Sequence, residues 1–251
     1  MPFSTPATLA PPPADLLTGA SLFLDFDGTL VDIAATPDAV SVDAALRAML
    51  GRLSHALDGR IALISGRSAC EIRALIGDGV TVAGSHGLEI LGADGRLDAP
   101  ARPPELSEVH AAMARLAADW PGVLVEDKPL GVALHFRQCP GAEAACRTLA
   151  TALAAETGLG LQPGKMVFEL RAQGGDKGAA LRRLLAAPAM AGSRPIFLGD
   201  DVTDEPGFAA ANDLGGAGVL VGSMRATNAR YRLADVAAAR LWLDQACRQP
   251  A

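Results

Sequence analysis

The segment Leu22-Phe23-Leu24-Asp25-Phe26-Asp27-Gly28 is the most informative part of this chain, because an apolar run ends there in two aspartates. A short apolar run of this kind is typical of a buried strand. Side chains at positions i and i+2 share a face of a strand, so Asp25 and Asp27 can point to the same side if the backbone stays extended. Gly28 then permits a sharp turn. Because ligands bind beyond the carboxyl ends of strands in open α/β sheets, we expect chemistry here.

The composition predicts a globular protein with a substantial core. Of 251 residues, half are hydrophobic and 20% are charged. The formal net charge of −6 argues against a nucleic acid or an anionic membrane as partner, because both would repel the chain. The four cysteines form no CxxC pair, so we expect reduced thiols and neither zinc nor disulfides; they are Cys70, Cys139, Cys146 and Cys247.

The N-terminal residues 1–13 are rich in proline and alanine. They lack the basic start and apolar core of a signal peptide, so we interpret them as a disordered lead-in. No apolar stretch approaches the length that spans a bilayer. We therefore expect a cytoplasmic protein with no membrane partner. We also expect a monomer, although the sequence itself does not indicate the oligomeric state.

Apolar runs alternate with helical patterns along most of the chain, which predicts an α/β fold with a parallel sheet flanked by helices. A helix is expected over 42–57 with Ser41 as its cap, and a second after Ser68, ending near Gly77. Residues 89–97 are typical of a hairpin. The expected strands are 21–26, 60–64, 81–84, 195–198 and 218–221.

The pattern changes near Pro103, which predicts a separate, smaller α+β domain. Apolar residues from Leu106 to Trp120 recur at helical spacing. Two antiparallel strands, 123–126 and 132–138, a helix over 142–156 and a strand over 166–171 are expected to follow. The predicted organisation is a core of 14–103 and 174–251, with residues 104–173 as an α-β-β-α-β insert that confers substrate specificity.

Four polar segments each end a predicted strand or begin a predicted helix. Each could be an ordinary turn or helix entry, but all four should meet at one edge of the sheet, which favours a shared site. The four are Asp25-Phe26-Asp27, Ser65-Gly66-Arg67, Gly175-Asp176-Lys177-Gly178, and Gly199-Asp200-Asp201-Val202-Thr203-Asp204-Glu205.

The residue types of these segments suit phosphate chemistry with Mg²⁺. Asp25, Asp200 and the peptide carbonyl of Asp27 offer the hard oxygen ligands that Mg²⁺ prefers. Ser65 offers a hydroxyl to a phosphate, and Lys177 offers a charge. A carboxylate that attacks a phosphate meets like-charge repulsion of about 4 kcal/mol at 4 Å and an effective dielectric constant of 20. Such a mechanism therefore needs both Mg²⁺ and Lys177.

The four segments, in this order, resemble the haloacid dehalogenase-like phosphohydrolase superfamily. The resemblance implies a Rossmann-like core in which Asp25 is the nucleophile and forms an aspartyl-phosphate. It implies that Asp27 protonates the leaving oxygen and then activates water. Asp200 is implied as a Mg²⁺ ligand, while Asp201 and Asp204 stay open as ligands, supporting residues or caps. Thr29 is expected to orient Asp27.

Three charged residues of the insert could read the substrate. Glu126 and Lys128 share a strand face only if the strand continues through both, and they could equally form an exposed turn. Glu169 lies in an apolar run and could sit on the solvent face of an edge strand. If the three face one site together, their hydrogen-bonding groups suit sugar hydroxyls.

Further motifs resemble the trehalose-6-phosphate phosphatase family over nearly the whole chain: Gly-Ser-His-Gly at 84–87, Glu126-Asp127-Lys128, Phe168-Glu169-Leu170 and Gly-Asp-Asp-Val-Thr-Asp-Glu at 199–205. The resemblance implies a phosphosugar substrate and contacts to it from Glu126, Lys128 and Glu169. His86 and Gly87 could line the pocket, or the His86 ring could brace its loop. Arg67 could bind substrate or form a surface ion pair.

Two positions depart from that family's pattern. Ala172 stands where proline is frequent, and Asp176 stands where asparagine or serine is common. Asp176 adds negative charge near the phosphate or caps the next helix. Three functions therefore stay open: hydrolysis of trehalose 6-phosphate, another sugar-phosphate phosphatase or phosphomutase activity, and phosphosugar binding by a catalytically silent regulator.

Overall fold

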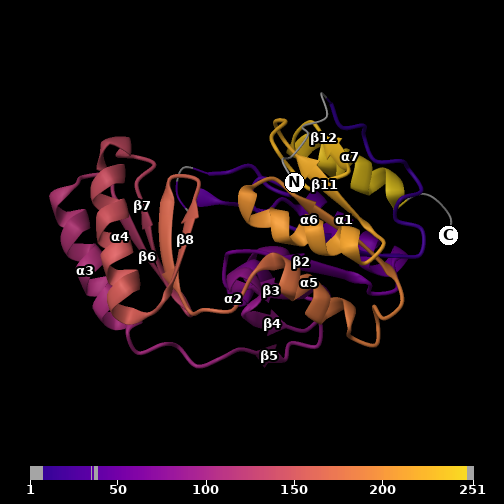
Figure 1. The fold of residues 1–251 in the computed structure, drawn as a ribbon. Coiled ribbons are helices and arrows are strands. Elements are labelled where there is room, and N and C mark those ends of the chain that lie inside the picture. The colour runs from indigo at the N-terminus through magenta and orange to yellow at the C-terminus, as the bar shows by residue number, and fades with distance from the viewer. Residues whose placement is uncertain (1–7, 35, 37–38, 248–251) are drawn as a thin grey trace. The chain divides into compact units, whose positions relative to one another are not determined.

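The computed structural model describes residues 8–34, 36 and 39–247 (Figure 1). The chain forms two compact units, Met1–Asp98 with Asp176–Ala251, and Ala99–Gly175. The sequence led us to expect the insert at 104–173, a few residues inside the second unit. The units are described separately below.

The larger unit contains an eight-stranded sheet in the order β12-β11-β10-β1-β2-β3-β4-β5. The pairs from β12 to β3 are parallel, and β4 and β5 join as an antiparallel hairpin, as expected. This confirms the predicted α/β class. The strands are β1 (Ala20–Leu24), β2 (Ile61–Ile64), β3 (Thr81–Gly84), β4 (Glu89–Leu91), β5 (Leu97–Asp98), β10 (Arg194–Gly199), β11 (Ala217–Val221) and β12 (Tyr231–Leu233).

Strand β1 lies inside this sheet between β10 and β2, and all five of its residues are buried. Its side chains alternate between two apolar clusters, because successive residues of a strand point to opposite faces. Leu22 and Leu24 pack with residues of α1 (Ala44–Ala56), α2 (Ala69–Ile76) and α7 (Val236–Ala246). Phe23 packs with residues of α5 (Lys177–Leu185) and α6 (Glu205–Asp213). The sheet is therefore covered by helices on both faces.

The two predicted helix starts have different outcomes. Helix α2 follows Ser68, as expected, and Ser68 caps it in a capping box with Glu71. The expected cap of α1, Ser41, is wrong: Asp43 is the cap and accepts a 2.6 Å hydrogen bond from the Leu46 amide. That bond, with the hydrogen bond from Arg240, lowers the pKa of Asp43, so the carboxylate form is favoured at this helix start.

The expected disordered lead-in is corrected for its described part, because residues 9, 10 and 12 are packed or hydrogen-bonded within the larger unit. Leu9 packs against an apolar cluster, and Pro12 is buried. The Arg232 amide donates a 3.0 Å hydrogen bond to the Ala10 carbonyl, which extends the pairing at the β12 edge. Residues 1–7 lie outside the described part.

The smaller unit contains a four-stranded antiparallel sheet in the order β6-β7-β9-β8. Its helices α3 (Leu106–Asp119) and α4 (Glu143–Thr157) share one apolar cluster with Val132, Leu134 and Phe168. The order is α-β-β-α-β-β, so the expected α-β-β-α-β was wrong by one strand. The strands are β6 (Leu124–Lys128), β7 (Gly131–His135), β8 (Gly160–Gly164) and β9 (Val167–Arg171).

Strand β8 was missed because its sequence, Gly-Leu-Gln-Pro-Gly, favours a turn over a strand. Pro163 is tolerated because β8 lies at an edge of the sheet, where an amide donor is not required on the open side. Strand β6 runs through Glu126 and Lys128, so the alternative of an exposed turn there is excluded.

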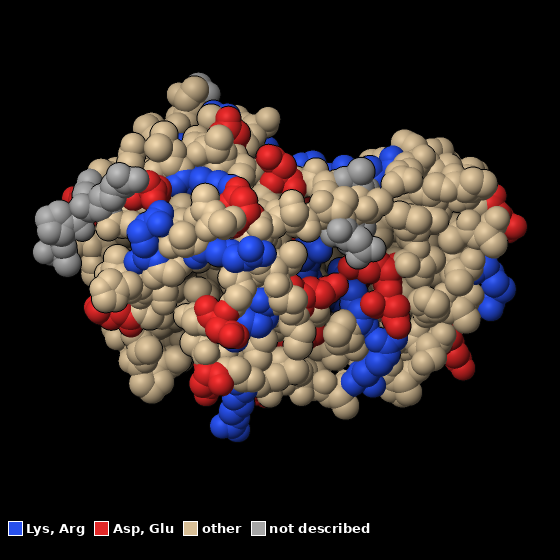
Figure 2. All heavy atoms as spheres, turned by 180° about the vertical axis from the view of Figure 1, so that it is seen from behind, with Lys and Arg blue, Asp and Glu red and all other residues tan. Residues whose placement is uncertain are grey.

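Acidic and basic side chains are interspersed on the face drawn in Figure 2, so this face has no large patch of a single charge sign. Within the part of the chain that the structure describes, no helix combines the length and apolar character needed to cross a bilayer.

Candidate active site

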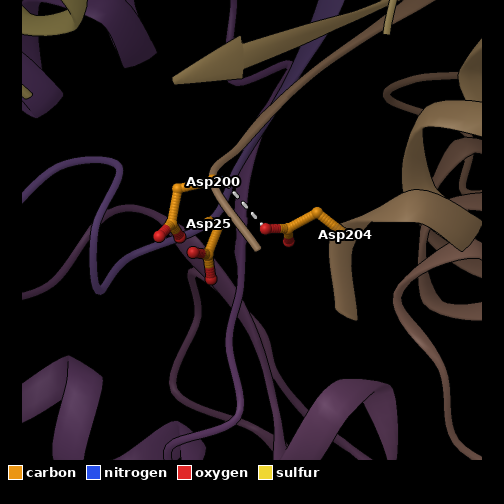
Figure 3. A group of neighbouring side chains, drawn as sticks. All are labelled: Asp25, Asp200 and Asp204. Atoms are coloured by element: carbon orange, nitrogen blue, oxygen red, sulfur yellow. Dashed lines mark hydrogen bonds between the residues drawn. The ribbon is translucent and has the colours of Figure 1, made fainter. Parts of the chain in front are cut away.

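The site is built where two neighbouring parallel strands end. Leu24 of β1 is in register with Leu198 of β10, and the Asp25 amide donates a 2.9 Å hydrogen bond to the Leu198 carbonyl. Asp25 and Asp200 follow these strands directly. Their carboxylates therefore converge at one edge of the sheet, as Figure 3 shows.

Three carboxylates form a tight group at this edge: Asp25, Asp200 and Asp204, with one oxygen from each within 4.8 Å of the others. Asp204 is fully buried and accepts hydrogen bonds from the amides of Asp200 (2.8 Å) and Asp201 (2.9 Å). The bond to the Asp200 amide is the dashed line in Figure 3. Asp204 thus orders the loop that presents Asp200.

Asp201 has a different role from Asp204, which the sequence left unresolved. Its side chain accepts a hydrogen bond from the Val202 amide and caps the short 3-10 helix Val202–Asp204. Within the described residues, Asp201 is not in the group of three carboxylates. It is a local cap.

Lys177, the first residue of α5, is the buried cation of the site. Its Nζ lies 2.6 Å from Asp25 Oδ1 and 2.6 Å from Asp204 Oδ1. Burial alone would lower the pKa of Lys177, but the carboxylates of Asp204 and Asp25 outweigh it and raise that pKa above its usual value. Asp176 caps α5 through a 2.8 Å bond from the Ala179 amide, so its cap interpretation is supported.

Asp25 is the carboxylate of the group whose charged form is disfavoured. Burial raises its pKa well above the usual value, and the nearby Asp204 and Asp200 raise it further, while Lys177 opposes the shift. Asp25 and Asp204 both bind Lys177, and Asp200 lies beside them, so the negative charge of the group exceeds the positive charge. A second cation at this edge would relieve it.

The oxygen donors at this edge fit Mg²⁺, which takes carboxylate and carbonyl ligands and keeps several waters. Gly28 has φ of +86°, and a Cβ built there would lie 2.3 Å from Asp200 Oδ2. Only a glycine lets the backbone approach the Asp200 carboxylate this closely. The turn after β1 is therefore shaped around that carboxylate.

Asp27 does not belong to the group of three. Its carboxylate is held by Arg67, whose Nε lies 2.7 Å from Oδ2 and whose Nη2 lies 2.9 Å from Oδ1. Of the two alternatives for Arg67, the structure contains an ion pair, and this pair is partly buried. Thr29, expected to orient Asp27, instead donates a long 3.4 Å contact to Asp25 Oδ2, so that expectation was wrong.

Ser65 is packed together with the turn at 85–87. Ser65 is buried, its hydroxyl accepts a 3.1 Å bond from the Arg67 amide, and its carbonyl accepts a 2.8 Å bond from the His86 amide. A Cβ on Gly66 would lie 2.7 Å from His86 Nε2, so that ring lies against the Gly66 backbone. This contact supports the bracing interpretation of His86.

Gly87 and Glu89 complete this bracing. Gly87 has φ of +98°, and a Cβ there would meet the Ala180 Cβ at 2.4 Å. Glu89, which the sequence did not single out, is buried and accepts hydrogen bonds from the Ser85 hydroxyl (2.7 Å) and the Ala69 amide (2.9 Å). Its apolar neighbours in sequence gave no signal of this role.

The smaller unit has a polar cluster of its own. Lys128 Nζ lies 2.8 Å from Glu169 Oε2 and 3.9 Å from Glu126 Oε2, so the structure brings the three predicted residues together. His135, which the sequence did not suggest, joins them through a 2.7 Å hydrogen bond between its Nε2 and Glu126 Oε2. Its signal was its place in a strand antiparallel to the Glu126 strand.

The doubly covered sheet, with acidic residues at the ends of β1 and β10 and a lysine opening α5, has the fold of a solved "haloacid dehalogenase-like hydrolase" of Bacteroides thetaiotaomicron, with a TM-score of 0.61 and 16% identity over 86% of this chain and 94% of that chain. The match to a family model, described as "Trehalose-phosphatase", extends over residues 23–237. This chain belongs to the trehalose-phosphatase family.

Two curated relatives and one solved structure illustrate the family match. A "Probable trehalose-phosphate phosphatase" of Sinorhizobium fredii is 40% identical over 80% of this chain and 77% of its own. A "Trehalose-6-phosphate phosphatase" of Escherichia coli is 39% identical over 88% of this chain and 84% of its own. A solved "trehalose-6-phosphate phosphatase related protein" has a TM-score of 0.76 and 27% identity, over 88% of this chain and 94% of its own.

Proposed function

We propose that this protein hydrolyses trehalose 6-phosphate to trehalose and phosphate, with Mg²⁺ as cofactor and a phosphorylated Asp25 as intermediate. The observation that carries the proposal is the buried carboxylate of Asp25 at the end of β1, bonded to Lys177 and grouped with Asp200 and Asp204. Relatives named for this substrate match over most of the chain.

Asp25 performs the first step. Its Oδ2 attacks the phosphorus while Lys177 holds Oδ1, and the bond between phosphorus and the sugar oxygen breaks. Asp27 enters this step protonated and donates that proton to the departing sugar oxygen, so trehalose leaves as a neutral alcohol. The product on the protein is an aspartyl-phosphate.

Asp27 also serves the second step. Now a carboxylate, it takes a proton from a water molecule that attacks the phosphorus of the aspartyl-phosphate. The bond between phosphorus and Asp25 breaks, phosphate leaves, and the Asp25 carboxylate is restored. Arg67 keeps the Asp27 carboxylate in one orientation between these steps.

Asp25, Asp200 and the peptide carbonyl of Asp27 would hold the Mg²⁺. When bound, Mg²⁺ neutralises the charge that two approaching anions bring together, a repulsion of about 4 kcal/mol at 4 Å and an effective dielectric constant of 20. Asp204 supports this from behind, since it binds the amides of the loop and pairs with Lys177.

The smaller unit supplies specificity in this proposal. Glu126 and Glu169 can accept hydrogen bonds from sugar hydroxyls, and Lys128 can donate them. The supporting observation is that the three side chains form one cluster on a sheet face. A site that hydrogen-bonds a substrate hydroxyl discriminates strongly against compounds that lack it.

Phosphate release from a panel of sugar phosphates tests the proposal. We expect much faster release from trehalose 6-phosphate than from glucose 6-phosphate or sucrose 6-phosphate, and loss of activity on chelation. Asp25→Asn should abolish turnover, while the matched control Asp213→Asn, at a solvent-exposed ion pair, should not. Beryllium fluoride should add to Asp25 in a crystal structure.

The panel also separates the alternatives. Equal rates on all three sugar phosphates would indicate a general sugar-phosphate phosphatase, and phosphate transfer between sugar positions would indicate a phosphomutase. Binding of the phosphosugar without turnover would indicate a silent regulator. Each of these results contradicts the proposed function.

A further inference from the structure

His135 lies on the same sheet face as the three charged residues of the smaller unit. In the register of β6 and β7, Leu124 faces His135 and Glu126 faces Ala133, so His135 is the diagonal neighbour of Glu126. Ala133 in turn faces Glu169 of β9. Because side chains alternate along a strand, Glu126, His135 and Glu169 share one face.

The centre of this face is made of small residues, over which the charged side chains lean. A Cβ on Gly131 would lie 2.9 Å from Glu169 Oε1, so that carboxylate lies over the Gly131 backbone. Gly131 faces both Lys128 and Arg171, and Ala133 is buried. The chemistry of the face is therefore set by the long side chains around these two positions.

Glu126 needs an orienting partner in this arrangement. The last torsion of a glutamate is broad, so its carboxylate turns easily unless donors fix it. Lys128 is nearer to Glu169 (2.8 Å) than to Glu126 (3.9 Å). His135 Nε2, at 2.7 Å, is thus the closer of these two donors to Glu126, and both face the same oxygen, Oε2.

We propose that His135 is a specificity-determining positioning residue, which donates Nε2–H to Glu126 and fixes the direction in which that carboxylate accepts hydrogen bonds from a sugar hydroxyl. The inference rests on the proposed role of Glu126 in sugar recognition. It assigns no proton transfer to His135, which acts through Glu126 alone.

Three substitutions at His135 test this donor. His135→Ala removes it, and kcat/KM for trehalose 6-phosphate should fall about tenfold, which corresponds to about 1.4 kcal/mol. His135→Gln places an amide donor near the former Nε2 and should restore most of the loss. His135→Asn is shorter, cannot reach Glu126, and should resemble His135→Ala. An aryl phosphate, which has no sugar hydroxyls, should be hydrolysed equally by all.

The matched control is His110→Gln, on helix α3 of the same unit, which should leave kcat/KM unchanged for both substrates. A second readout is the ring nitrogen spectrum of His135, one of four histidines, assigned with His135→Gln. Glu126→Gln should shift the His135 Nε2 resonance. No shift would overturn the inferred hydrogen bond.

If His135→Ala leaves the ratio of kcat/KM for the sugar phosphate to kcat/KM for the aryl phosphate unchanged, the inference is overturned. Equal losses on both substrates would mean that His135 only braces the unit. If the panel identifies a sugar phosphate other than trehalose 6-phosphate, the proposed function fails, but the same ratio measured on that substrate still tests His135.

Discussion

Arg67 binds both carboxylate oxygens of Asp27, at 2.7 and 2.9 Å, through two different nitrogens of one guanidinium. A pair of parallel hydrogen bonds fixes both the position and the plane of a carboxylate, which a single bond cannot do. Asp25, the proposed nucleophile, is bonded to Lys177 instead. The two aspartates of the first motif are therefore held by different cations, in keeping with different proposed roles.

Arg67→Lys should lower kcat on trehalose 6-phosphate about tenfold, because an ammonium is a point charge and cannot replace the planar two-nitrogen fork. The measurement is steady-state kinetics beside Arg183→Lys, which alters an exposed ion pair with Asp98 and should have no effect. If Arg67→Lys kept full activity, the orienting role of Arg67 would be refuted.

Lys177→Met should destabilise the protein by about 3–5 kcal/mol, because it leaves the buried carboxylates of Asp25 and Asp204 without their shared cation. It should also remove activity. Lys165→Met is the matched control, since Lys165 is exposed, and should leave stability nearly unchanged. Urea denaturation without Mg²⁺ measures the stability of both variants. Equal stability would contradict the buried interaction of Lys177 with Asp25 and Asp204.

Asp25→Asn should stabilise the Mg²⁺-free protein at neutral pH. The folded-state pKa of Asp25 is raised, so its contribution to stability is full below the unfolded pKa of about 3.9 and declines as pH rises through the folded value. Asparagine has no such decline, so the melting temperature of the variant should be higher than that of the wild type.

The sign of this effect is what thermal denaturation between pH 4 and pH 8 would check. The advantage of Asp25→Asn should shrink toward pH 4, where the wild-type carboxyl is protonated in the folded state. Added Mg²⁺ should reverse the order of the two proteins. A variant less stable than wild type at neutral pH without Mg²⁺ would disagree with the raised pKa.

Gly28→Ala should weaken Mg²⁺ binding at least tenfold, about 1.4 kcal/mol, because its Cβ would occupy the position of the Asp200 carboxylate. Gly19→Ala is a strict control: Gly19 also has a positive φ, but a Cβ there has no neighbour within 4 Å. Both variants carry similar backbone strain. Calorimetric titration should show weaker Mg²⁺ binding in Gly28→Ala only. Equal affinities of the two variants would show that Asp200 does not bind the metal.

Local patterns were sufficient for the main strands of the larger unit and for the segments that meet at its edge. The apolar run before Asp25 and the one before Asp200 each predicted a buried strand, and parallel neighbours necessarily present their carboxyl ends together. Patterns were insufficient for β8, whose Pro163 is compatible with a strand only because the strand lies at an edge.

Motif and spacing thus established the family, the α/β class and the set of acidic and basic groups at the sheet edge, because these depend on residues close together in the chain. The partners of individual side chains came from the fold alone. Arg67 with Asp27 and Asp204 with Lys177 are pairings over long separations, and His135 with Glu126 is a pairing across a hairpin. The reason is physical. A side chain's partner depends on which segments pack beside it, and that is settled by burial of the whole core.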